Sequence, residues 1–124
     1  MLEAQPAPVG LIKDSSDQEF MADVIDASQD VPVIVDFWAP WCGPCKQLGP
    51  ILEKVVNGAG GKVKLVKVDI DQEGALASRY GVTAVPTLKI FEGGIEAHSV
   101  VGLPRPQDLV AQVEKVAGSI GSSR

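Results

Sequence analysis

The chain has 124 residues, of which 45% are apolar, and its formal net charge at pH 7 is −5. This length predicts one domain that can bury a hydrophobic core without cross-links. Charges of both signs are mixed along the chain, which argues against nucleic-acid binding. A membrane span needs about 20 apolar residues in a row, and no apolar stretch approaches that length. Residues 1–14 lack the features of a secretion signal, so we expect a cytoplasmic protein whose cysteines are catalytic or metal-binding.

The first third of the chain predicts an arm, a helix and a buried strand. Residues 1–10 are expected to form a flexible arm. A short edge strand is expected at residues 9–12, where the arm meets the domain. Ser16 and Glu19 have the spacing of a capping box, which predicts the start of a helix. Its apolar face would carry Phe20, Met21, Val24, Ile25 and Ala27. Residues 33–38 are almost continuously apolar, which is typical of a central strand covered on both faces.

The rest of the chain alternates between helical and strand patterns, with glycines between them. The predicted helices cover residues 47–56, 72–80 and 104–117, and the predicted strands cover residues 63–69, 87–91 and 95–101. Pro50 is expected to kink its helix, and Gly93 and Gly94 predict a hairpin. The order predicts an α/β fold over residues 11–117, with a central mixed β-sheet flanked by helices on both faces. Residues 118–124 are expected to form a flexible tail.

The only two cysteines stand in residues 41–46, Trp-Cys-Gly-Pro-Cys-Lys, between the apolar strand and a helix. The N-terminus of a helix favours a thiolate, which is the nucleophile of disulfide exchange. We therefore expect Cys42, nearest the helix end and solvent, to be the nucleophile and Cys45 the resolving thiol. Gly43 would allow a tight turn, and Pro44 is tolerated in a first helical turn. Inert thiols, or half of a zinc site completed by other ligands, are the alternatives.

Asp36 is the anomaly of the apolar strand. It shares a face with Ile34 and Trp38, where a lone buried carboxylate is costly. We expect a raised pKa and a role as the acceptor of a proton from Cys45, directly or through water. Lys67, on the neighbouring strand, is the expected charge partner. A structural Asp36 and a Lys67 on a plain exposed face are the alternatives.

The chain resembles the thioredoxin family over residues 11–116. The resemblance is carried by residues 36–39, 41–46, 50, 67–71, 80–82, 85–88, 93–94 and 101–102. It implies the thioredoxin fold and a protein disulfide reductase that works by reversible dithiol–disulfide exchange. It also implies that no cofactor is bound, because NADPH is used indirectly through a flavin-containing thioredoxin reductase. The implied partners are that reductase and disulfide-containing substrate proteins, and we expect a monomer.

The resemblance also implies a substrate surface. The Val85–Pro86 bond would be cis with its proline facing the disulfide, so that the backbone of Val85 could pair with an extended substrate segment. The remaining surface residues would be Trp41, Gly43, Pro44, Gly102 and Leu103. Leu103 stands where a smaller family residue is common, and Gly102 and Leu103 could also be plain turn residues.

A second function would use the same apolar surface without turnover. The opening of the chain resembles thioredoxin-like domains fused to helical-repeat co-chaperones, which suggests a co-chaperone or scaffold module as the alternative. No repeat segment is present in this sequence. An oxidase or isomerase is disfavoured, because Gly43-Pro44 resembles the reducing members of the family.

Overall fold

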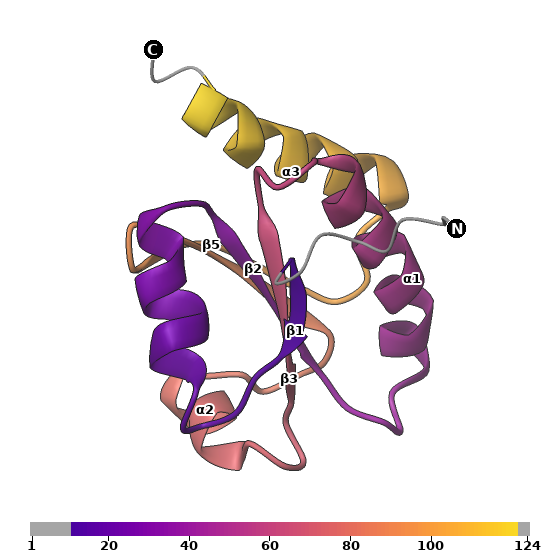
Figure 1. The fold of residues 1–124 in the computed structure, drawn as a ribbon. Helices are drawn as coiled ribbons and strands as arrows, with labels where there is room; N and C mark the ends of the chain where they lie inside the picture. Colours follow the sequence, from indigo (N-terminus) through magenta and orange to yellow (C-terminus); the bar gives the residue numbers. More distant parts are fainter. Residues whose placement is uncertain (1–10, 122–124) are drawn as a thin grey trace, which may run out of the picture.

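The computed structural model describes residues 11–121. Five strands form one mixed sheet, with helices on both faces (Figure 1). In spatial order the strands are β1 (Ile12–Asp14), β3 (Lys64–Asp69), β2 (Val33–Trp38), β4 (Thr87–Glu92) and β5 (Ile95–Val101). The first three are parallel, and β4 and β5 are antiparallel to their neighbours. This confirms the predicted α/β architecture.

Two hydrophobic cores lie on opposite faces of the sheet. One lies beneath α1 (Gly43–Gly58) and α3 (Pro106–Gly121). The other lies beneath α2 (Gly74–Arg79) and a first helical segment, which consists of the π-type η1 (Met21–Asp26) and the 3-10 helix η2 (Ala27–Gln29). None of the described helices is both long and apolar enough to cross a membrane.

Strand β2 is the centre of the molecule. It pairs with β3 on one side and β4 on the other, and both of its faces are covered by helices. Its residues from Val33 to Phe37 are at most 1% exposed. A strand in this position must be apolar on both faces, which is why its sequence does not alternate.

Several element boundaries differ from the predicted ones. Strand β1 starts at Ile12, whereas the prediction placed a strand at 9–12, of which residues 9 and 10 lie outside the described residues. Helix α1 is longer than the predicted amphipathic stretch 47–56, and the cysteine motif forms its first turn, as its expected position at the helix start implies. Helix α3 continues to Gly121, where the prediction ended it at 117; Val116 and Ala117 are buried and anchor this end of the helix. The predicted arm, residues 1–10, and residues 122–124 also lie outside the described residues.

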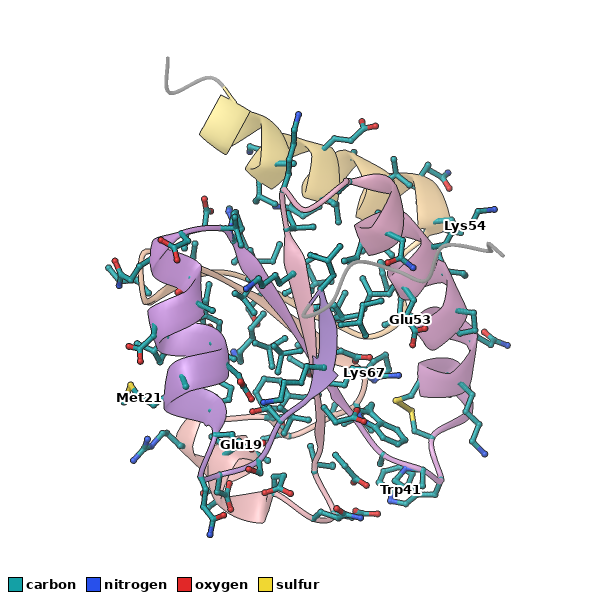
Figure 2. The ribbon with its side chains drawn as sticks, viewed as in Figure 1. Glu19, Met21, Trp41, Glu53, Lys54 and Lys67 are labelled. Carbon is teal, nitrogen blue, oxygen red and sulfur yellow. A yellow bond between two sulfur atoms is a disulfide. The ribbon has the colours of Figure 1, made fainter. Side chains whose placement is uncertain are left out.

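Met21 was predicted to face the core, and this is wrong. Its side chain is 58% exposed and points away from the sheet (Figure 2). The wider turn of the π-type segment changes the angular spacing of side chains from that of an α-helix. Phe20 and Val24, predicted on the same face, are buried as expected.

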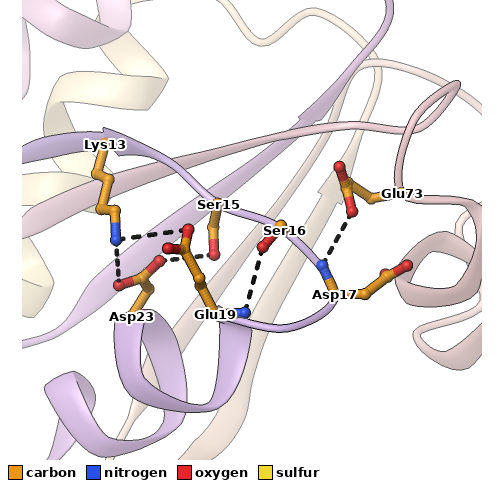
Figure 3. Close-up of polar contacts among 7 residues, drawn as sticks. All are labelled: Lys13, Ser15, Ser16, Asp17, Glu19, Asp23 and Glu73. Atoms are coloured by element: carbon orange, nitrogen blue, oxygen red, sulfur yellow. Dashed lines mark hydrogen bonds and ion pairs between the residues drawn. The ribbon is translucent and has the colours of Figure 1, made fainter.

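The start of the first helical segment is held by polar contacts (Figure 3). The backbone N–H of Glu19 donates to Ser16 Oγ at 3.3 Å, which is one half of the predicted capping box. Lys13 Nζ lies 3.7 Å from Glu19 Oε1 and so links β1 to this segment. The backbone N–H of Asp17 donates to Glu73 Oε1 at 2.9 Å, which connects the same turn to the residue before α2.

Ser28 connects the first helical segment to the hairpin between β4 and β5. Gly93 and Gly94 have φ values of 61° and 81°, as the predicted tight turn requires. The N–H of Gly93 donates to the carbonyl of Ser28, and the N–H of Gly94 donates to its Oγ, both at 2.8 Å. The hydroxyl donates in turn to the carbonyl of Ile25 at 3.0 Å. Ser28 is 4% exposed, so its hydroxyl is shielded from water.

Ser28→Ala is therefore expected to lower the free energy of unfolding by about 1–3 kcal/mol, because both hydrogen bonds of the buried hydroxyl, from the N–H of Gly94 and to the carbonyl of Ile25, would be lost. Chemical denaturation measures the change. The matched control is Ser78→Ala on the exposed side of α2, which should change stability by less than about 0.5 kcal/mol. Equal effects of the two substitutions would show that the Ser28 hydroxyl does not stabilise the hairpin.

Candidate active site

Cys42 and Cys45 form a disulfide at the start of α1, with their Cα atoms 5.3 Å apart (Figure 2). Cys42 is the N-cap of the helix, and its Sγ accepts a hydrogen bond from the backbone N–H of Cys45 at 3.2 Å. This is the strand-to-helix turn that the sequence predicted. The described residues contain no group of three or more His, Cys, Asp and Glu side chains arranged to hold a metal ion.

The two cysteines are equally buried, each 4% exposed, so the expectation that Cys42 is nearer solvent is wrong for this oxidised state. Gly43 and Pro44, between them, are exposed. Gly43 does not have a positive φ, so the turn does not require glycine as predicted. A Cβ at Gly43 would meet no atom within 4 Å, which shows that the surface beside the disulfide is open.

Trp41 is the most exposed aromatic side chain beside the disulfide (Figure 2). It is 66% exposed. Its indole Nε1 donates to Asp71, with distances of 3.0 and 3.3 Å to the two carboxylate oxygens. This hydrogen bond limits the orientations that the large, exposed indole ring can adopt. No sequence pattern singled out Asp71, although it lies in residues 67–71, which carry part of the family resemblance.

A second part of the predicted substrate surface comes from the loop before β4. Val85 packs against the buried cluster that contains both cysteines, and the Val85–Pro86 peptide bond is cis, as the resemblance implied. The N–H of Gly102 donates to the carbonyl of Pro86 at 2.8 Å, which holds the end of β5 against this loop. Leu103 follows and is 45% exposed. Val85 is thus linked to the cysteines and Pro86 to Gly102, although these residues are far apart in the sequence.

Asp36 and Cys45 line one cavity of about 220 Å³. Its lining residues come from β2, β3 and α1, and they are Asp36, Trp38, Cys45, Lys46, Gly49, Pro50, Glu53 and Lys67. Asp36 is 1% exposed, and its Oδ1 has no hydrogen-bond partner among the described residues. Burial raises the pKa of Asp36 from its ordinary value of 3.8 to about 6, while the charge of Lys67 lowers it and that of Glu53 raises it.

Lys67 lies where the sequence placed it, on the strand next to β2 and in register with Asp36. Its Nζ, however, lies 3.2 Å from Glu53 Oε2 and donates a hydrogen bond to it (Figure 2). The same Nζ is 5.6 Å from the centroid of the Trp38 ring, within the range of a cation–π interaction. The charge partner expected for Asp36 is thus bound directly to a different carboxylate.

Glu53 was missed at the sequence level, although a signal for it exists. It stands eight residues after Cys45 and four after Gly49 on α1. Residues four apart lie on the same face of a helix, one turn above another. Both Cys45 and Gly49 line the cavity, so the helical spacing alone would have placed Glu53 at this wall.

Comparison with known proteins gives a consistent result. Residues 11–115 match the family model described as Thioredoxin. The chain is 44% identical over 100 residues to Thioredoxin 1 of Nostoc sp., a match that covers 81% of this chain and 92% of that protein. It is 45% identical over 93 residues to Thioredoxin of Streptomyces clavuligerus, covering 75% and 84%. It is 40% identical over 100 residues to the chloroplastic Thioredoxin M4 of Arabidopsis thaliana, covering 81% and 51%.

A cysteine pair that closes a disulfide at the N-terminus of a helix, above a sheet of this topology, defines a thiol–disulfide oxidoreductase. The chain belongs to the thioredoxin family, and it is a protein disulfide reductase. The family works without a bound cofactor, and its partners are disulfide-containing substrates and a reductase.

Asp36→Asn is expected to raise the free energy of unfolding at pH 8 and to change it little at pH 4. Between pH 3.8 and about pH 6 the folded protein keeps a proton on Asp36 that the unfolded chain releases. The free energy of unfolding therefore falls as the pH rises through this window. Above it the penalty is on the order of 3 kcal/mol, which the neutral amide would remove. Denaturation curves at several pH values measure the difference.

The control for this experiment is Asp30→Asn, the same substitution at an exposed position. It should leave the pH dependence of stability as it is in the native protein. A gain from Asp36→Asn that is the same at pH 4 and pH 8 would contradict a raised pKa at Asp36.

Proposed function

We propose that Cys42 is the nucleophile and Cys45 the resolving thiol of this disulfide reductase. In the reduced protein the Cys42 thiolate attacks one sulfur of a substrate disulfide, which breaks that bond and releases the other sulfur as a thiolate that takes up a proton. The Cys45 sulfur, after losing its proton, then attacks Cys42 Sγ and releases the second substrate thiol. The protein is left with the Cys42–Cys45 disulfide. Two electrons pass from the protein to the substrate.

The observation that carries this assignment is the position of Cys42 as the N-cap of α1. Its Sγ already accepts the backbone N–H of Cys45 at 3.2 Å. A sulfur in this position faces the positive end of the helix dipole, which lowers the pKa of a thiol and increases the thiolate fraction. Cys45 lies inside the first turn and lines the cavity with Asp36, where its proton can be removed.

Asp36 is proposed as the acceptor of the Cys45 proton. An effective general base has a pKa near the pH at which it works, and burial raises the pKa of Asp36 to about 6. Its Oδ1 is unpartnered among the described residues and so remains available to accept a hydrogen bond. The cavity of about 220 Å³ has room for several water molecules, at about 30 Å³ each, that could relay the proton. Lys67 is proposed to stabilise the negative charge of the ionised Asp36, the form that can accept the proton.

The rim of the disulfide is proposed as the substrate-binding surface. Its members are Trp41, Gly43, Pro44, Val85, Pro86, Gly102 and Leu103. The exposed indole of Trp41 and the half-exposed Leu103 offer apolar contact area, and Val85 packs against the cysteine cluster. An extended substrate segment could pair with the backbone of Val85 by β-strand addition. Backbone pairing does not select side chains, so we expect broad substrate specificity.

Re-reduction is proposed to come from a thioredoxin reductase that uses NADPH, with the protein acting as a monomer in the cytoplasm. Membership of the thioredoxin family supports the reductase as partner. The sequence holds only two cysteines, and both form the active-site disulfide, so neither is left for a structural cross-link. This composition supports a reducing compartment. Turnover of insulin disulfides with reductase and NADPH tests the proposal, because a scaffold module would show none.

Cys45→Ser is expected to accumulate stable mixed disulfides with substrate proteins. Cys42 can still attack in this variant, but no second thiol resolves the adduct. Cys42→Ser should trap few, because its remaining thiol is not the attacking one. Mass spectrometry of the covalent adducts measures both variants. Equal trapping would overturn the assignment of the two roles.

Asp36→Asn is expected to slow disulfide reduction at pH 7 by roughly 10-fold to 100-fold, since it removes the general base. Single-turnover reduction of a model disulfide, expressed per folded molecule, measures this, and Asp30→Asn is again the control. A variant with the native rate per folded molecule would show that Asp36 has only a structural role.

A further inference from the structure

Glu53 and Lys67 form an ion pair in the wall of the cavity that contains Asp36. Lys67 Nζ lies 3.2 Å from Glu53 Oε2. The Lys67 side chain is 23% exposed and the Glu53 side chain is 41% exposed, so the pair lies where the cavity meets solvent. Neither the cysteine chemistry nor the substrate rim requires Glu53, and the sequence resemblance assigns it no role.

Three carboxylates lie around Lys67: Glu53 on α1, Asp36 in register on β2, and the exposed Asp14 in register on β1. Lys67 is in register with Asp36 on the neighbouring parallel strand, and strands lie about 4.8 Å apart. The flexible four-carbon stem of lysine allows its ammonium to reach in several directions. In this structure the ammonium is bound by Glu53 and lies 5.6 Å from the centre of the Trp38 ring, while Asp36 Oδ1 has no hydrogen-bond partner among the described residues.

We propose that Glu53 is a positioning residue, which holds the Lys67 ammonium away from Asp36 and thereby sets the pH at which Asp36 takes up its proton. This inference rests on the proposed role of Asp36 as proton acceptor. A Lys67 bound directly to Asp36 would keep that carboxylate ionised and make it a weaker base for the Cys45 proton. Glu53 prevents this, and its own negative charge favours the protonated form of Asp36.

The other groups around Asp36 are few. Helix α1 contributes Glu53 and Lys46 to the cavity, and β3 contributes Lys67. From β4, the residue in register with Asp36 is the uncharged Leu88, and Trp38 on β2 is also uncharged. Removing the charge of Glu53 therefore leaves two cations and no second carboxylate among the described residues of this wall. The proton affinity of Asp36 should fall.

The test is a carbon-13 NMR titration of the Asp36 carboxyl in the oxidised, full-length protein. Glu53→Gln is expected to move the midpoint of the Asp36 titration to lower pH by about half a pH unit, the size typical of one partly exposed charge. Lys67→Gln is expected to move it to higher pH. The matched control is Glu114→Gln, an exposed glutamate on α3, which should leave the midpoint unchanged.

The double variant separates positioning from simple charge. If Glu53 acts through Lys67, then Glu53→Gln should shift the midpoint less when Lys67→Gln is already present. No shift in Glu53→Gln, the same shift in Glu114→Gln, or an undiminished shift in the double variant would each overturn the proposal. The titration needs no turnover, so its failure is distinct from failure of the Asp36 role, which appears only as native-rate reduction by Asp36→Asn.

Discussion

The burial of β2 on both faces is the constraint on which the rest of the structure depends. The strand lies between β3 and β4, with one core above it and one below. Helix α1 begins only a few residues after β2 ends, so the cysteine motif is fixed at the carboxyl end of the central strand of the sheet. In open α/β sheets this is the edge where ligands bind and where chemistry takes place.

The same burial raises the pKa of Asp36. A carboxylate on an exposed strand would ionise near its ordinary value, but one that is 1% exposed is disfavoured as an anion. The protein therefore keeps a group that lowers its stability at neutral pH. Such a cost is common at functional sites, where local rules of folding are broken for chemistry. The pair formed by Lys67 and Glu53 adjusts this cost without filling the cavity.

Two environments meet at the disulfide. Cys45 lines the cavity that contains Asp36 and Lys67, whereas Cys42 caps the helix and is not part of the cavity wall. Val85 packs against the cysteine cluster and belongs to the apolar rim. The arrangement places the two sulfurs in different surroundings, as the proposed roles of nucleophile and resolving thiol require. The two cysteine side chains meet different surroundings although they lie within one helical turn, with their Cα atoms only 5.3 Å apart.

The sequence by itself determined the order of the elements, the cysteine turn, the anomaly at Asp36 and the strand that carries Lys67. These depend on periodicity and short spacings, which are local properties of the chain. Only the tertiary structure decided that Lys67 binds Glu53, that Trp41 is held by Asp71, and that the two cysteines are equally buried. Those outcomes depend on how α1 is rotated over the sheet and on which loops meet there. Long-range packing sets both, and no local pattern encodes them.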